Sequence, residues 1–230
     1  MIAGGLLSIS EIAKKAIGRR DWQTLEFVAS KLCDEYPNEP ETFFITGVLA
    51  RARGQYDEAQ RSFERGLTLA PERYDLAVEL ASLYAKMLRH GDAFTLLENA
   101  TPFLGGSPLY SDMAGSVLTS LGMPDRALPL AQRAHKLQPE VDIFAANLAH
   151  CLGFVGKHKQ SAELYTALLL KNPNHRRNHY ELARVQRALD TSHIEQMNGV
   201  MANDPAPENR NIPLFFAPVS YTHLRAHETS

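Results

Sequence analysis

A long internal repeat constrains the fold of this chain more than any other feature of its sequence. Prolines stand at Pro37, Pro71, Pro139 and Pro173, and the differences between these positions are 34, 68 and 34. Small residues recur with the same period, at Ala13, Gly47, Ala81, Gly115 and Ala149 in one register and at Ala59, Ala93, Ala127 and Ser161 in another. A fixed period of this length indicates one supersecondary unit that is copied and stacked along the chain.

Each unit is predicted to be a helical hairpin. Apolar residues follow helical spacing in two runs, residues 43–53 and 56–69 in the clearest copy, with a short polar break between them. Gly54, Gly122 and Gly156 fall at this break, where a positive φ costs glycine least. The proline late in the unit ends the second helix because it has no amide proton and clashes with the preceding turn. The small residues let the helix axes approach closely.

The stretch PETFFITGVLARARGQYDEAQRSFERGLTLAP, residues 40–71, resembles the tetratricopeptide repeat (TPR). The residues that carry this resemblance are Phe43, Gly47, Gly54, Tyr56, Ala59, Phe63 and Pro71. Other copies depart from the pattern at Leu25 and Ser161, which replace the second small residue, and at Gly105, which replaces the proline. The resemblance implies an all-α fold, a right-handed TPR solenoid of antiparallel helix hairpins with a concave groove.

Five units and part of a sixth are predicted. They cover residues 6–39, 40–73, 74–107, 108–141 and 142–175, and the sixth starts at residue 176, so that the array occupies residues 1–189. Residues 190–204 are expected to form a degenerate helix, and residues 205–218 a linker towards a domain that is missing from this chain. Residues 219–230 break the composition abruptly and resemble translated sequencing adapter, so we expect this tail not to be native.

The resemblance also predicts a binding surface, because in this family the first helix of each hairpin lines the groove at places 2, 5, 9, 12 and 13 of the unit. The residues predicted to line it are Phe44, Val48, Arg51, Ser82, Lys86, Ser116, Thr119, His150, Tyr180, Arg184 and Arg187. This mixture suits a protein or peptide segment, including the chain's own missing C-terminal domain. The alternative is that they are solvated helix residues. Asp112 shares this face and would repel a terminal carboxylate, so chaperone tails are not expected to bind.

The charge pattern narrows the class of partner. The net charge of −2, from 24 basic and 26 acidic residues, is too balanced for the whole chain to attract nucleic acid or anionic lipid. From Lys157 to Arg187, however, seven basic residues occur with two acids. This segment suits an acidic linker, a phosphate-bearing ligand or a neighbouring catalytic domain, or else it is a solvated helix face. Aromatic residues are not interleaved with these cations, which argues against nucleic acid.

No motif predicts catalysis, a metal site or a cofactor. The sequence has no Gly-rich phosphate loop and no nucleophile elbow, so these 230 residues are not expected to be an enzyme. His175 and His179 are spaced to share a helix face, but no carboxylate completes a metal site. Cys33 and Cys151 are expected to pack as small apolar residues. Such cysteine usage and the lack of a long apolar run predict a cytoplasmic protein that binds no membrane.

Residues 193–217, HIEQMNGVMANDPAPENRNIPLFFA, are similar to the junction between the repeats and the catalytic domain in a bacterial family of repeat-bearing sulfotransferases. This resemblance implies an alternative function. The chain would be the N-terminal recruiting arm of an enzyme that transfers sulfuryl from 3'-phosphoadenylyl sulfate to an acceptor hydroxyl, with the catalytic domain absent. The donor-binding loop of that family, of the form P-R-S-G-T-T, is not in this sequence, so no catalytic residue is carried over.

Overall fold

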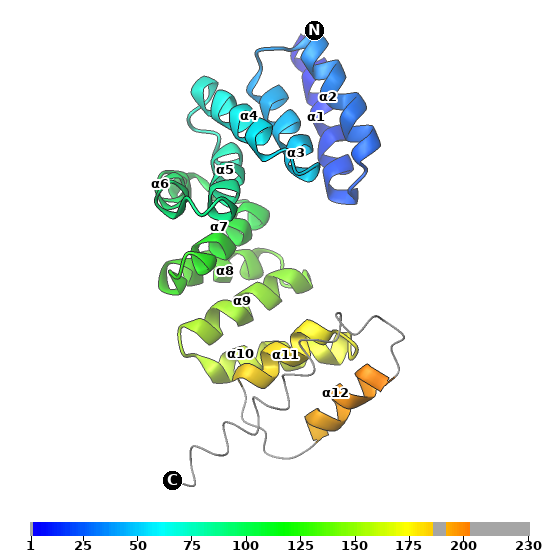
Figure 1. Ribbon diagram of the computed structural model, residues 1–230, viewed down its shortest axis with the longest axis vertical. Helices are drawn as coiled ribbons and strands as arrows, with labels where there is room; N and C mark the ends of the chain where they lie inside the picture. Colours follow the sequence, from blue (N-terminus) through cyan, green and yellow to red (C-terminus); the bar gives the residue numbers. More distant parts are fainter. Residues whose placement is uncertain (1, 186–191, 203–230) are drawn as a thin grey trace. The chain divides into compact units, whose positions relative to one another are not determined.

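The chain folds into helices alone over the residues that its computed structural model describes, which are 2–185 and 192–202. Within these ranges there are twelve α-helices, one short 3-10 helix and no strand (Figure 1). The all-α prediction is therefore confirmed there. Arg187, the predicted linker 205–218 and the predicted tail 219–230 lie outside the described residues.

The helices repeat with the period of the sequence. The first helices of the predicted units are α1 (Ile2–Arg19), α3 (Pro40–Ala52), α5 (Tyr74–Lys86), α7 (Pro108–Ser120), α9 (Asp142–Phe154) and α11 (Arg176–Val185). The second helices are α2 (Trp22–Glu35), α4 (Tyr56–Leu69), α6 (His90–Ala100), α8 (Pro124–Leu137), α10 (His158–Lys171) and α12 (Ser192–Ala202), and η1 (Thr101–Phe103) follows α6. From α3 onward each first helix starts exactly one period after the previous one, and all the second helices do the same.

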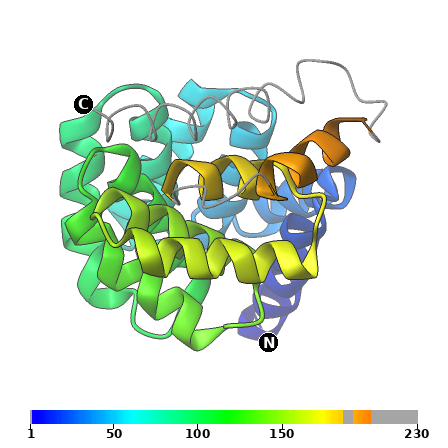
Figure 2. The ribbon, with the colours of Figure 1, turned by 90° about the horizontal axis from the view of Figure 1, so that it is seen from below.

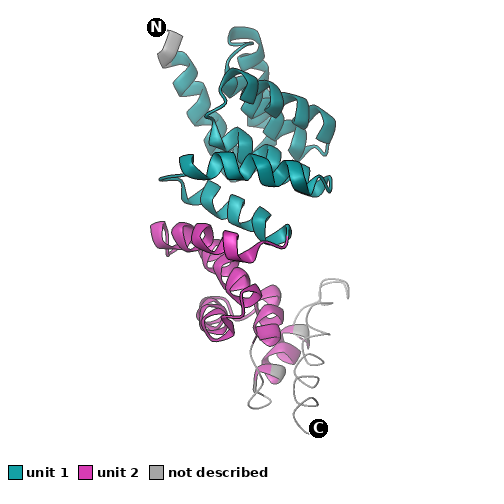
Figure 3. Cartoon of the chain, turned by 90° about the vertical axis from the view of Figure 1, so that its left-hand side faces the viewer, with its two compact units in different colours: residues 1–121 teal, residues 122–230 magenta. Residues whose placement is uncertain are grey.

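Two compact units make up the chain, residues up to Leu121 and residues from Gly122 (Figure 3). In unit 1, α3 packs on α4, α4 on α5, and α5 on both α6 and α7. In unit 2, α9 packs on both α8 and α10, and α10 packs on α11. Within each unit, contacts therefore join helices that are close in sequence, as in a stack of repeats. Figure 2 shows α10 to α12 of unit 2 in yellow to orange.

The repeated small residues lie where helices meet. Ala81 and Ala149 in one register, and Ala59 and Ala93 in the other, are fully buried. Gly47 has the closest approach, since an added Cβ there would lie within 3.0 Å of ring atoms of Phe63. The small residues thus set how closely α3 and α4 approach, as the sequence predicts.

The break between the helices has the predicted left-handed backbone. Gly54, Gly122 and Gly156 have φ of 77°, 76° and 78°. The equivalent places in the first and third units hold Arg20 and Leu88, whose φ values of 55° and 60° are also positive. The turn therefore keeps one geometry even where the residue is not glycine.

The two cysteines differ in environment. Cys151 is buried, and its Sγ lies 3.3 Å from the carbonyl oxygen of Pro124. Cys33 is exposed, which corrects the prediction that it packs as a small apolar residue. The buried stripe of α2 consists of Leu25, Val28, Ala29 and Leu32, and Cys33 falls beside that stripe.

Candidate functional site

In unit 1 the first-helix face carries a buried ion pair. Arg51 of α3 places Nη2 3.2 Å from Oε2 of Glu79 on α5. The Glu79 side chain is 6% exposed, and burial raises its pKa although the charge of Arg51 acts in the opposite direction. Ser82 is half-buried and Lys86 is exposed on the same helix. The predicted residue Arg51 thus acts first as the counter-ion of a buried acid.

Two predicted groove residues are core residues in the structure. Phe44 is 4% exposed and Val48 is 1% exposed. The guanidinium of Arg73 lies 5.6 Å from the centroid of the Phe44 ring and covers it. A partner therefore cannot reach these two side chains without displacing their neighbours.

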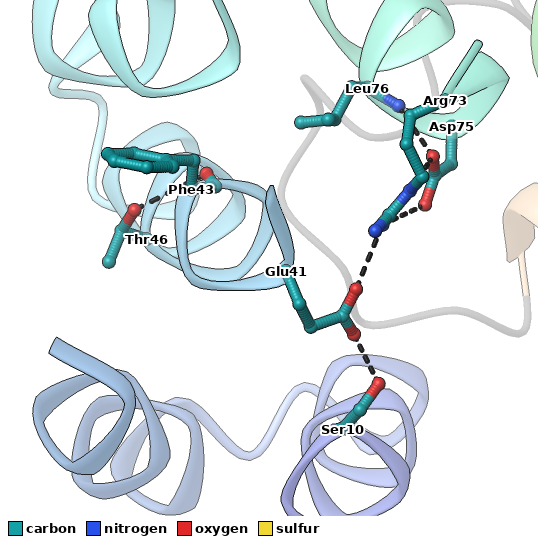
Figure 4. A network of polar contacts seen from close by, with 7 residues as sticks. All are labelled: Ser10, Glu41, Phe43, Thr46, Arg73, Asp75 and Leu76. Atoms are coloured by element: carbon teal, nitrogen blue, oxygen red, sulfur yellow. Dashed lines mark hydrogen bonds and ion pairs between the residues drawn. The ribbon is translucent and has the colours of Figure 1, made fainter. Parts of the chain in front are cut away.

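A polar network ties together α1, α3 and the start of α5 (Figure 4). Arg73 donates from Nη2 to Glu41 Oε2 at 2.9 Å and from Nε to Asp75 Oδ1 at 2.7 Å. Ser10 Oγ donates to the other oxygen of Glu41. Burial lowers the pKa of Arg73, but its bonds to Asp75 and Glu41 outweigh burial and raise it. A cavity of about 620 Å³ adjoins this network and is also lined by Leu6, Leu7 and Lys14.

On α7 one of the two predicted residues makes a hydrogen bond within its own helix, and the other is exposed. Thr119 is half-buried and donates from Oγ1 to the carbonyl oxygen of Gly115 at 2.9 Å. Ser116 is exposed. Neither hydroxyl adds charge to the first-helix face of unit 1.

In unit 2 the structure brings together His150 of α9 with Tyr180 and Arg184 of α11. They meet around Glu181, which is 7% exposed. Arg184 Nη1 lies 2.8 Å from Glu181 Oε2, and His150 Nε2 lies 3.9 Å from Glu181 Oε1. The Arg184 guanidinium is also 6.0 Å from the centroid of the Tyr180 ring. Burial lowers the pKa of His150, although Glu181 opposes this, so the imidazole is neutral at pH 7.

Phe154 at the end of α9 extends this cluster. Its ring packs edge to face on His150 with a centroid distance of 4.8 Å, and the Arg184 guanidinium lies 5.7 Å from the Phe154 centroid. Phe154 remains 51% exposed. The cluster therefore offers an aromatic surface beside a charged group, which suits contact with a partner's side chain.

A cavity of about 260 Å³ lies in the same unit. It is lined by Asp142, Ile143, Ala146, Asn147 and His150 of α9, Tyr165 and Leu168 of α10, Asn172 and His175 of the next loop, and Arg177, Asn178 and Glu181 of α11. The lining includes apolar side chains together with amides, imidazoles and charged groups. The cavity therefore combines apolar walls with hydrogen-bonding groups, as binding sites do.

Glu79 and Phe154 were not among the predicted site residues. Glu79 is an acid within the apolar run from Leu76 to Leu83, and a lone acid in such a run is the signal that could have identified it. Phe154 occupies place 13 of its unit, so the groove frame could have identified it.

The described residues include no group of three or more His, Cys, Asp or Glu side chains that could hold a metal ion. Over the same part of the chain, no helix is both long and apolar enough to cross a membrane.

Comparison with known proteins identifies the fold class. No family model and no curated protein matches the sequence. Among solved structures, YrrB, a TPR protein with an unusual peptide-binding site, matches with a TM-score of 0.62 over 83% of this chain and 97% of its own, at 17% identity. The thermophilic TPR protein TTC0263 of Thermus thermophilus matches at 0.61, over 78% of this chain and 97% of its own, with 15% identity. PilF of Pseudomonas aeruginosa matches at 0.65 over 96% of both chains, with 12% identity.

These likenesses agree with the helix order and the period described above. The chain has the all-α TPR repeat fold that its sequence predicts. At 12–17% identity the likeness concerns the fold.

Proposed function

We propose that this chain is a protein-interaction scaffold that holds a peptide or a partner-domain segment on its first-helix face. The observation that carries the proposal is the cavity of unit 2, which lies among α9, α10 and α11 and is lined in part by the predicted residue His150. The TPR fold supports it, since stacked helix pairs expose a long face made of first helices. We propose no catalytic activity for these 230 residues.

The lining of this cavity fits an extended peptide. Ile143 is 56% exposed and offers an apolar contact, and the half-buried Asn147 carries a carboxamide, a group that can both donate and accept hydrogen bonds. A peptide backbone presents alternating donors and acceptors, which carboxamides can match. The volume of about 260 Å³ suits one or two side chains of a ligand. Further binding area would come from Phe154 and Tyr180.

Selection from a phage-displayed library of random peptides tests the proposal, followed by fluorescence anisotropy with the selected peptides. Ala146 lines the cavity, so Ala146→Gln fills it without removing a side-chain hydrogen bond. We expect this variant to weaken peptide binding by about tenfold or more, because the lost contacts and the steric conflict cost at least 1.4 kcal/mol, roughly.

Ala167→Gln is the matched control, because Ala167 is exposed on α10 and is not part of the cavity lining. It should bind peptides as the original chain does, and circular dichroism should show equal helicity in both variants. The proposal fails if the library yields no binding peptide, or if Ala146→Gln binds the selected peptides as tightly as the control.

The sulfotransferase arm is the alternative proposal. It is supported by the sequence similarity of residues 193–217, of which residues 203–217 lie outside the described residues. Reading the uninterrupted gene beyond Ala217 tests it. A strand followed by the sulfotransferase phosphate loop is the expected result, and further repeats in its place would contradict the alternative.

A further inference from the structure

The cavity of about 620 Å³ in unit 1 has more acids than cations in its lining. Its charged groups are four carboxylates and two cations, namely Glu39, Glu41, Glu72 and Asp75 with Lys14 and Arg73. Arg73 Nη2 lies 2.9 Å from Glu41 Oε2 and 2.6 Å from Asp75 Oδ2, and the guanidinium also covers the ring of Phe44. These contacts fix Arg73, so it is not free to neutralise further acids.

Two acids of the lining, Glu39 and Glu72, are exposed and form no ion pair with any residue that the structure describes. Acids before a helix often cap its first amides or interact with its dipole. Glu39 directly precedes α3, but its side chain makes no capping hydrogen bond there. Glu72 lies two residues before α5, whose N-cap is Arg73. Capping therefore occupies neither carboxylate, and both can accept hydrogen bonds from a cation of another molecule.

Apolar side chains line the same cavity. Leu6 lies one helical turn before Ser10 on α1, so it shares a helix face with the hydroxyl that binds Glu41. Leu7, the next residue, also lines the cavity and is 67% exposed. A lysine or arginine buries its methylene stem along apolar surface of this kind and keeps its charged end at polar groups. The lining therefore matches both parts of a basic side chain.

We infer that the cavity of unit 1 binds a lysine or arginine side chain from a peptide segment of a partner protein. The charged end lies beside Glu39 and Glu72, and the methylene stem lies against Leu6 and Leu7. The charge of unit 1 favours such a partner, because residues 1–121 contain 16 acidic and 12 basic residues, whereas the rest of the chain contains 10 acidic and 12 basic residues. This site goes beyond the proposed function, which rests on the cavity of unit 2.

A peptide selection tests the inference. The bait is the full chain with Ala146→Gln, in which the cavity of unit 2 is filled, and the library displays random dodecapeptides with constant residues at both ends. We expect enrichment of peptides in which Lys or Arg recurs at one position. Selected peptides are then synthesised with acetylated N-termini, so that their cations are side chains alone, and their affinities are measured by fluorescence anisotropy. Gln in place of the recurrent basic residue should weaken binding about tenfold or more.

The double variant Glu39→Gln/Glu72→Gln, made in the same Ala146→Gln chain, removes the two acids that form no ion pair. An exposed ion pair contributes a few-fold to affinity, so the loss of both should raise the dissociation constant about tenfold. Asp34→Asn/Glu58→Gln is the matched control, because both residues are exposed in unit 1, lie outside the lining, and change the net charge equally. It should keep the affinity, and circular dichroism should show equal helicity in both double variants. Added NaCl should also weaken binding.

Three results would contradict the inference. Selected peptides without a recurrent basic residue assign binding to other contacts. Equal affinities of the two double variants assign binding to something other than the acids of the lining. A selection on the Ala146→Gln chain that enriches no peptide also contradicts the inference. The proposed function keeps its own test in each case, because that test uses the original chain and the cavity of unit 2.

Discussion

At five equivalent places, each one repeat after the last, the backbone between two helices has a positive φ. Three of them hold glycine, and the other two hold Arg20 and Leu88. An L-residue in the left-handed region brings its Cβ close to the following carbonyl oxygen, at a cost of about 1–2 kcal/mol. The two non-glycine turns are thus less stable than the same turns with glycine would be. The packing of the surrounding helices offsets this cost.

Leu88→Gly is expected to stabilise the chain. Leu88 is 79% exposed, so little packing is lost with its side chain. Relief of the left-handed strain exceeds the extra backbone entropy that glycine loses on folding, which leaves a gain of about 0.5–1 kcal/mol in the free energy of unfolding. Chemical denaturation monitored by circular dichroism measures it.

Gly54→Ala gives the opposite change and serves as the control. Its added Cβ would meet no atom within 4 Å, so any effect comes from the backbone conformation. We expect the free energy of unfolding to fall by about 1 kcal/mol. If Leu88→Gly lowered the stability as Gly54→Ala does, the left-handed geometry at position 88 would be contradicted.

At the scale of helices, α12 is held against α11 by two histidines. His179 is 1% exposed, and its Nε2 donates to the carbonyl oxygen of Pro173 at 2.7 Å. Neutral His179 must then accept at Nδ1, which lies 2.8 Å from Nε2 of His193 on α12. His193 is therefore the donor, and the pair is satisfied when both rings are neutral.

Acid is expected to weaken this contact. Burial, and then the charge of His179, lower the pKa of His193 to about 4, and burial also lowers the pKa of His179. An unfolded histidine has a pKa of about 6.5, so between about pH 6.5 and 4 the unfolded chain binds more protons than the folded one. Stability should therefore fall as the pH falls through this window and be independent of these groups above pH 7, approximately.

Denaturation curves of the original chain and of His193→Gln over that pH range measure this effect. The variant loses the hydrogen bond to His179, so it is less stable at neutral pH, but its stability should decline less steeply in acid. His158→Gln is the control, because His158 is exposed at the start of α10 and should leave the decline unchanged. Parallel curves for all three chains would contradict the assignment.

The repeat frame predicted the helices well because small residues and glycines are required at fixed places of the hairpin. It predicted less well which residues of the first-helix face are exposed. His150, Tyr180 and Arg184 do come together, whereas Phe44 and Val48 are buried. The frame specifies which side of a first helix a residue occupies. It does not specify how far a side chain from elsewhere in the chain reaches across that side, as the side chain of Arg73, the residue before α5, does over Phe44.

Buried acids were harder still to predict. Glu79 and Glu181 are each stabilised by an arginine, Arg51 from another helix and Arg184 from the next turn. Such pairing depends on rotamers and on the spacing of helices, which a periodic pattern does not contain.

At the scale of the whole molecule, the stacking of neighbouring repeats predicts that a destabilising substitution affects mainly the helices next to it. Within unit 1, α6 packs on α5 and η1. Ala93 of α6 is fully buried, so Ala93→Glu places a charge and extra volume in a closed contact. The cost is on the order of 3 kcal/mol or more. In a fold in which each repeat contacts its neighbours in sequence, that loss is concentrated in the adjoining helices.

Hydrogen exchange followed by mass spectrometry measures how far the loss of stability spreads from α6, through the amide protection of each helix. In Ala93→Glu we expect amide protection to fall most in α5 and α6, while α9 and α10 in unit 2 keep theirs. Asn99→Glu adds the same charge at an exposed position of α6 and should leave every helix protected as before. If Ala93→Glu lowered the protection of α9 and α10 as much as that of α5 and α6, the chain would unfold as one cooperative body. That result would contradict the nearest-neighbour account of its stability. In a stack of repeats, the effect of a local defect on stability becomes weaker at each interface between repeats.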